Sequence, residues 1–174
     1  MQIDWPRLRG RCIVGIFLVL GVAQIYLQAR GHEYGHDFEG GTWAAGRAVL
    51  HGASPFPTVA EPSYLLAHSN AFITPPLLAL VGAPFSLLPF AVAVIAFNLL
   101  CVACLLGALR LLDVTDRGFL VVVLCSFPFI ASLGLGQPDG IFALGAAAAW
   151  RWRGSDRGAV AAGAIIAAKL LAWP

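Results

Sequence analysis

Charged side chains are scarce in this sequence, and lysine is almost absent. The 174 residues include 11 Lys or Arg and 9 Asp or Glu, or 11% charged, whereas soluble domains carry about 25%. So few charges cannot cover a soluble globular protein, and a hydrophobic content of 59% excludes intrinsic disorder. A net charge of +2 provides no basic stripe for nucleic acid. The mean hydropathy of +0.81 therefore indicates a protein that lies in lipid.

Long stretches of the chain contain no charged residue at all. These stretches cover residues 62–109, 118–138 and 140–150. A membrane-spanning helix needs about 20 apolar residues, so four or five spans are expected, at 12–29, within 74–112, at 119–135, at 140–152 and from about 158 onward. The first follows three arginines but is long for a signal peptide and has no small-residue cleavage site, so we expect an uncleaved signal-anchor. We predict an all-α, multi-pass transmembrane bundle forming one domain over residues 1–174.

The distribution of arginine predicts the orientation of this bundle. Three arginines occur in 1–11 and three in 151–158, whereas 31–74 carries four acids and one arginine. Short basic segments stay on the cytoplasmic side, so the N-terminus is predicted to be cytoplasmic and the loop 30–74 extracytoplasmic. Two cytoplasmic ends require one crossing within 74–112, with an additional short helix near 75–85. The alternative, a hairpin within 74–112, would place 151–158 outside.

The four cysteines do not predict a redox or metal site. All lie in apolar runs, and the C-x-x-C of Cys101 and Cys104 has neither a second cysteine pair nor a nearby histidine. Free cysteines are commonly just buried. Because no carboxylate pair occurs at ligand spacing either, we predict no metal ion and no cofactor.

The outer loop contains the first candidate for chemistry, Asp37. It follows the first predicted span and precedes an expected amphipathic juxtamembrane helix over 42–50, which His51-Gly52 and Ser54-Pro55 end. Such a helix lies along the membrane surface, which would place Asp37 at the edge of a cavity between the spans. A carboxylate there can accept a proton from an attacking sugar hydroxyl. The alternative is an ordinary solvated or helix-capping acid.

Three further polar residues lie at or near membrane depth. Gln137 and Asp139 fall between two predicted spans, on the same side as Asp37, and Lys169 lies within the last apolar segment. Polar groups at this depth are costly unless they are used. The alternatives are a simple turn at 136–140 and a lysine that extends to the membrane surface.

The sequence resembles glycosyltransferase family 87 in a series of short motifs that occur in the same order. Members of this family are polyprenol-phosphate-mannose-dependent mannosyltransferases of the multi-spanning GT-C architecture. The matching elements are Asp37-Phe38, Ala44-Ala45, Leu50-x-Gly52-x-Ser54-Pro55-Phe56, Phe72-x-x-Pro75-Pro76, Pro84, Leu88-Pro89, Gly136-Gln137, and Ala162-Gly163 leading to Lys169 and Pro174. The chain departs from the family at Ile73-Thr74, where an aromatic is common, and at Pro138-Asp139, where Asn often follows Gly-Gln. It also has about half the length of such enzymes, so we expect it to be a truncated N-terminal half that is inactive alone.

The resemblance implies a membrane glycosyltransferase of the cell envelope that acts at the outer face of the cytoplasmic membrane. Its donor would be a polyprenyl-phosphate-linked sugar, mannose or another hexose, and its acceptor a glycolipid or glycan. Asp37 would be the general base, while Lys169 suits the donor phosphate and Gln137 and Asp139 suit sugar hydroxyls. The further substrate-binding candidates are His36, Arg47, His68 and Asn70.

Two other classes of protein fit part of the pattern. A small multi-pass transporter or channel module would use Gln137, Asp139 and Lys169 to line a pathway, although the sequence contains no inverted second half. A membrane fragment without a catalytic site is the other alternative.

Overall fold

The computed structural model describes residues 5–31, 34–56 and 76–168, and every regular element in these ranges is helical. The elements are α1 (Trp5–Gly31), the π-helix η1 (Phe38–Trp43), α2 (Ala44–Leu50), α4 (Pro76–Gly82), the 3₁₀-helix η2 (Phe85–Leu87), α5 (Phe90–Leu111), α6 (Arg117–Leu124), α7 (Phe127–Leu135), α8 (Asp139–Arg151) and α9 (Asp156–Ala168). The predicted all-α class is therefore confirmed.

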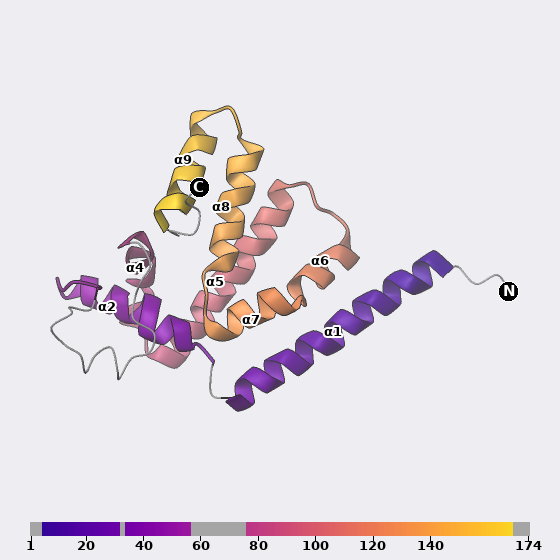
Figure 1. The fold of residues 1–174 in the computed structure, drawn as a ribbon, viewed down its shortest axis with the longest axis horizontal. Coiled ribbons are helices and arrows are strands. Elements are labelled where there is room, and N and C mark those ends of the chain that lie inside the picture. The colour runs from indigo at the N-terminus through magenta and orange to yellow at the C-terminus, as the bar shows by residue number, and fades with distance from the viewer. Residues whose placement is uncertain (1–4, 32–33, 57–75, 169–174) are drawn as a thin grey trace.

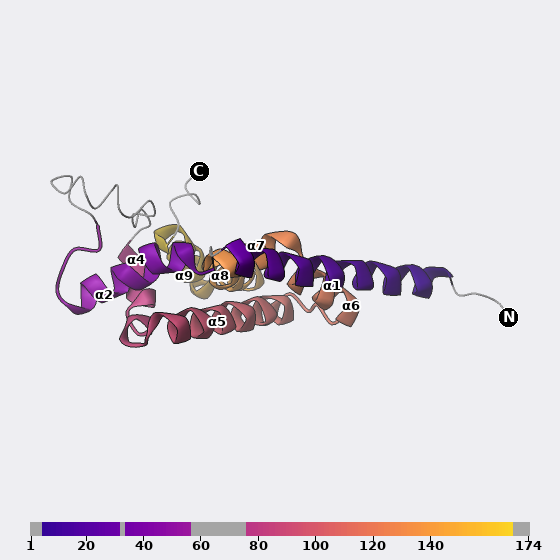
Figure 2. The ribbon, with the colours of Figure 1, turned by 90° about the horizontal axis from the view of Figure 1, so that it is seen from below.

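The helices form a flat assembly from which α1 extends to one side. Helices α5 and α8 pack along each other, and α9 returns beside α8 (Figure 1). Helix α1 runs along α6 and α7, and one close contact is at Gly21, where a Cβ atom would lie 2.8 Å from Cδ1 of Ile130. Seen from below, α5 lies on one side of the assembly, while α1, α7 and α8 lie on the other (Figure 2). The short elements η1, α2, α4 and η2 gather near the start of α5 (Figure 1).

One described helix, α5, is long and apolar enough to cross a membrane by itself. Helices α6 and α7 pass the same criterion together, but they are bent by 47° at the break between them. The apolar part of α1, Cys12–Gln28, is shorter, and α8 has 13 residues. The described residues thus contain one helix that is able to span a membrane, or two if the bent pair is one span, and the multi-pass bundle stays a prediction.

The segment predicted as one span over 119–135 is in fact broken. Asp116 caps α6 by accepting a hydrogen bond from the backbone N–H of Phe119 at 2.8 Å. The break follows at Cys125 and Ser126, and Pro128 lies in the first turn of α7. Because proline lacks a backbone N–H and its ring clashes with the preceding turn, a straight helix cannot continue through this position.

The region 74–112 contains one long helix rather than a hairpin in its described part. The short α4 and η2 precede α5, and Pro89 marks the start of α5. This layout has the short helix and the single long helix that the charge distribution requires. The orientation of the chain in the membrane stays a prediction.

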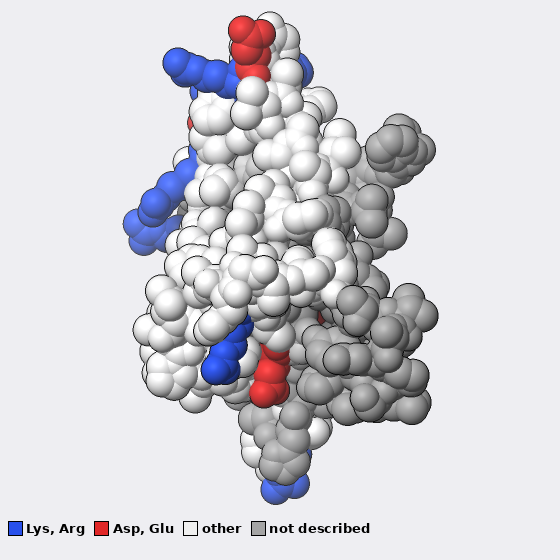
Figure 3. All heavy atoms as spheres, turned by 90° about the vertical axis from the view of Figure 1, so that its left-hand side faces the viewer, with Lys and Arg blue, Asp and Glu red and all other residues white. Residues whose placement is uncertain are grey.

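Much of the surface is apolar. Large hydrophobic side chains are exposed along α1, at Val19, Val22 and Leu27, and on α5, at Ile95 and Leu99. The face seen in Figure 3 is mostly uncharged in its described part, and its few charged side chains lie in small groups. Extended apolar surface of this kind indicates contact with lipid or with other helices.

An aromatic cluster anchors η1 to the start of α5. Phe38 is fully buried, and its ring stacks on that of Phe97 with 4.6 Å between the ring centroids. Phe85 meets Phe97 edge-on at 5.5 Å, and Phe90 stacks on Phe38 at 6.4 Å. Aromatic pairs in these geometries stabilise a fold beyond the area that they bury. The cluster therefore fixes the backbone directly beside Asp37.

Candidate functional site

Two of the residues selected from the sequence meet in the structure. The side-chain amide of Gln137 donates a hydrogen bond from Nε2 to Oδ2 of Asp37 at 2.8 Å, although the two residues are 100 positions apart. Asp37 immediately precedes η1, and Gln137 lies in the connection between α7 and α8. Both side chains are half-buried. The amide thus holds the carboxylate in one orientation.

Two glycines let these segments approach each other. The backbone N–H of Gly35 donates to the carbonyl of Gly134 at 2.6 Å, and Gly35 has a φ of 76°. Gly136 has a φ of 77° and ends α7 in the left-handed conformation that glycine adopts at helix ends. A Cβ atom at Gly136 would lie 2.5 Å from Cβ of Phe38. The contact between the segment around Phe38 and the α7–α8 connection therefore depends on the absence of a side chain at Gly136.

Replacing Gly136 with Ala is expected to destabilise the protein and to separate Asp37 from Gln137. The left-handed conformation costs a residue other than glycine about 1–2 kcal/mol, and the new methyl group would also collide with Phe38. Thermal unfolding of the purified variant should show a lower Tm. Gly41→Ala is the matched control, because a Cβ at Gly41 meets nothing within 4 Å. Equal Tm values for the two variants would contradict this account.

Asn98 supports the site from the middle of α5. Its Nδ2 group donates to the hydroxyl of Tyr34 and to the carbonyl of Leu133, both at 2.9 Å. These bonds tie α5 to the residues just before Asp37 and just before the α7–α8 connection. Asn98 is not among the residues selected from the sequence, although a single amide inside a long apolar run is a signal that identifies such a residue.

The other candidates lie in different surroundings. His36 is exposed beside Asp37, and Asp139 is the first residue of α8, where a carboxylate interacts favourably with the helix dipole. Arg47 lies on α2 and lines a separate cavity. His68, Asn70 and Lys169 fall outside the described residues.

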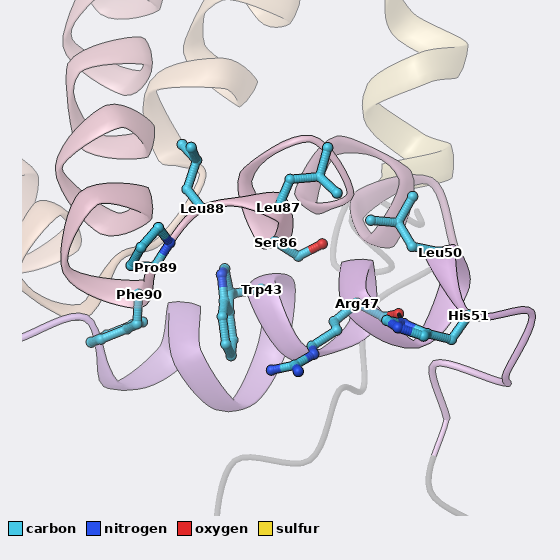
Figure 4. Close-up of a pocket in the computed structure, with 9 residues that line it drawn as sticks. All are labelled: Trp43, Arg47, Leu50, His51, Ser86, Leu87, Leu88, Pro89 and Phe90. Carbon is cyan, nitrogen blue, oxygen red and sulfur yellow. Dashed lines mark hydrogen bonds between the residues drawn. The ribbon is translucent and has the colours of Figure 1, made fainter.

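The cavity beside Arg47 has a volume of about 710 Å³ and lies between α2 and the segment leading into α5 (Figure 4). Its wall combines a cation, an imidazole, a hydroxyl and several apolar groups, from Trp43, Arg47, Leu50, His51, Ser86, Leu87, Leu88, Pro89 and Phe90. Of these residues, the sequence identifies only Arg47 as a ligand-binding candidate. Trp43 fits the face of an amphipathic helix and His51 fits a helix end, and no local sequence pattern connects either residue with Ser86.

The Asp37–Gln137 pair has the parts that acid–base chemistry on a hydroxyl group needs. A half-buried carboxylate can accept a proton, and a fixed amide sets its direction. The arrangement suits a step in which one proton is removed from a nucleophile.

Comparison with known proteins connects this geometry to a family. The sequence model of glycosyltransferase family 87 matches residues 72–173, more than half of the chain. The chain therefore belongs to glycosyltransferase family 87. No curated protein and no solved structure matches it. The matched range includes Gln137 but begins after Asp37, which is linked to that range by the hydrogen bond to Gln137.

Proposed function

From its membership in glycosyltransferase family 87, we propose that this membrane glycosyltransferase transfers a hexosyl unit, mannosyl in the simplest case, from a polyprenyl-phosphate-linked donor. The acceptor is a glycolipid or glycan at the outer face of the cytoplasmic membrane. The observation that carries the proposal is the hydrogen bond between Asp37 and Gln137. It joins an acid of the predicted outer loop to the part of the chain that matches the family.

Asp37 acts as the general base in this proposal. Its carboxylate accepts the proton of an acceptor hydroxyl while the hydroxyl oxygen forms a bond to the anomeric carbon of the donor sugar. The bond from the anomeric carbon to the phosphate oxygen breaks, and the lipid phosphate leaves with the electron pair. The proton then passes from Asp37 to water. Gln137 is a positioning residue, because its amide orients the carboxylate.

The remaining candidates receive supporting roles. Lys169 interacts with the phosphate as a compact positive charge, and Asp139 hydrogen-bonds to sugar hydroxyls. His36, His68 and Asn70 complete the polar surroundings on the predicted outer side. Arg47 lies in the cavity beside α2, and its role is developed below.

A transfer assay tests the proposed reaction. The native gene is expressed so that any sequence adjoining residues 1–174 is retained, and its product is reconstituted in vesicles. We expect radiolabel from polyprenyl-phosphate-linked mannose to enter a glycan or glycolipid product, and little label to enter it from a nucleotide-linked mannose. Transfer from the nucleotide sugar alone would contradict the donor class. Solute flux through the vesicles without any transfer would instead support the transporter interpretation.

A further inference from the structure

We propose that the cavity between α2 and the η2–α5 segment binds the phosphate group and the adjoining apolar chain of a lipid phosphate. The inference rests on the proposed function, in which such a lipid carries the donor sugar. It adds a binding site that lies apart from the Asp37–Gln137 pair. The proposal rests on the residues that line the cavity, which place polar groups on one side and apolar groups on the other.

The cation of the cavity is Arg47. Its guanidinium lies 5.6 Å from the centroid of the Trp43 ring, a cation–π contact that holds the side chain against the wall. Within the part of the chain that the structure describes, no carboxylate lies within ion-pair distance of Arg47. A guanidinium presents several N–H donors in a plane, a geometry that matches phosphate oxygens. A phosphate group at this wall would meet the guanidinium of Arg47.

His51 adds a second polar group at the same side of the cavity. Its Nδ1 atom lies 2.7 Å from the carbonyl oxygen of Arg47. Because a carbonyl only accepts, Nδ1 carries the hydrogen in this contact, and Nε2 takes no part in it. The hydroxyl of Ser86 donates its hydrogen to the carbonyl of Ala83 at 2.8 Å, so Arg47 is the donor of this wall on which phosphate binding depends.

The opposite side of the cavity is apolar. Figure 4 shows the side chains of Leu87, Leu88 and Leu50 on the side away from the guanidinium of Arg47. Leu87 is 74% exposed and Leu50 is 47% exposed, so both would gain from contact with a hydrocarbon chain. Free phosphate would leave this apolar wall uncovered, whereas a lipid phosphate contacts both sides.

The cavity and the Asp37 site share one wall. Phe90 lines the cavity, and its ring also stacks on that of Phe38, the residue after Asp37. Trp43 meets Phe90 edge-on at 6.0 Å. The aromatic cluster thus lies between the cavity and Asp37 and fixes both to the start of α5.

Equilibrium binding tests this site on the native gene product in phosphatidylcholine nanodiscs. The probes are farnesyl phosphate, farnesol and inorganic phosphate. We expect farnesyl phosphate to bind saturably and more tightly than either of the other two. Arg47→Gln should weaken its binding by about tenfold or more, since a charge-assisted hydrogen bond is lost. Leu87→Asn should weaken it as well, without a change in Tm.

Arg153→Gln is the matched control, because Arg153 also lies over an indole ring, that of Trp150, at 4.6 Å. It should leave the binding of farnesyl phosphate unchanged. Equal binding by wild type and Arg47→Gln, equal weakening by Arg153→Gln, or inorganic phosphate binding as tightly as farnesyl phosphate would each overturn the proposal. Phosphatidylglycerol added to the nanodiscs should compete weakly, and complete competition would assign the cavity to bulk anionic lipid instead.

The outcome is distinguishable from a failure of the proposed reaction. Asp37→Asn should bind farnesyl phosphate as the wild type does, because Asp37 does not line the cavity. If the protein binds farnesyl phosphate in this way but performs no sugar transfer, the lipid-phosphate site is supported and the proposed reaction is refuted. If the wild type transfers sugar but Arg47→Gln does not change the binding of farnesyl phosphate, the proposed reaction is supported and the lipid-phosphate site is refuted.

Discussion

Asp37→Asn is expected to lower the rate of sugar transfer by about 10²- to 10⁴-fold, the contribution that a general base makes. Asparagine has nearly the same shape but cannot take up the proton of the acceptor hydroxyl. The attack on the anomeric carbon must then proceed from a neutral hydroxyl. The measurement is the initial rate of label transfer from polyprenyl-phosphate-linked mannose by the native gene product and its variant, at equal protein amounts.

Glu39→Gln is the control for this substitution. Glu39 is an exposed acid two residues after Asp37, within η1, so it tests whether any loss of negative charge in this loop slows transfer. We expect Glu39→Gln to transfer at close to the wild-type rate. Full activity in Asp37→Asn would refute the assignment of the base, and an equal loss in Glu39→Gln would show that charge alone is responsible.

Gln137→Ala is expected to reduce the rate by about 10- to 100-fold, because a carboxylate that is no longer held drifts from the attacking hydroxyl. The effect should fall mainly on kcat and much less on KM, since the amide is proposed to orient the base rather than to bind the lipid. The Tm of the variant separates this effect from unfolding. A rise in KM at unchanged kcat would show that Gln137 binds substrate instead.

The general class of the fold follows from the sequence, but its details depend on tertiary packing. The lack of charge predicts helices in lipid, and every regular element among the described residues is helical. The bend between α6 and α7 was missed, although Pro128 is visible in the sequence, because apolar composition alone predicts a continuous span. The η1 helix was also not predicted, because no local residue pattern of the segment 38–43 indicates a π-helix.

In the candidate site, too, the single residues can be predicted from the sequence but their contacts depend on tertiary packing. Asp37 and Gln137 could be selected individually as polar residues next to apolar runs. Their hydrogen bond could not, because it requires the left-handed conformation of Gly136 and its contact with Phe38. The sequence predicts that Arg47 binds substrate. It does not predict the cavity beside Arg47, because that cavity is formed by the packing of α2 against the η2–α5 segment. Packing of this kind brings together residues that share no sequence motif.

The central claim is that Asp37 and Gln137 act as one unit, and the double variant Asp37→Asn/Gln137→Ala tests it most directly. Residues that act as a unit show strongly non-additive effects. If Gln137 works only by orienting the Asp37 carboxylate, the single-turnover rate of the double variant should equal that of Asp37→Asn. If the two losses instead multiply, Gln137 contributes to transfer independently of Asp37, and the account of the site is wrong.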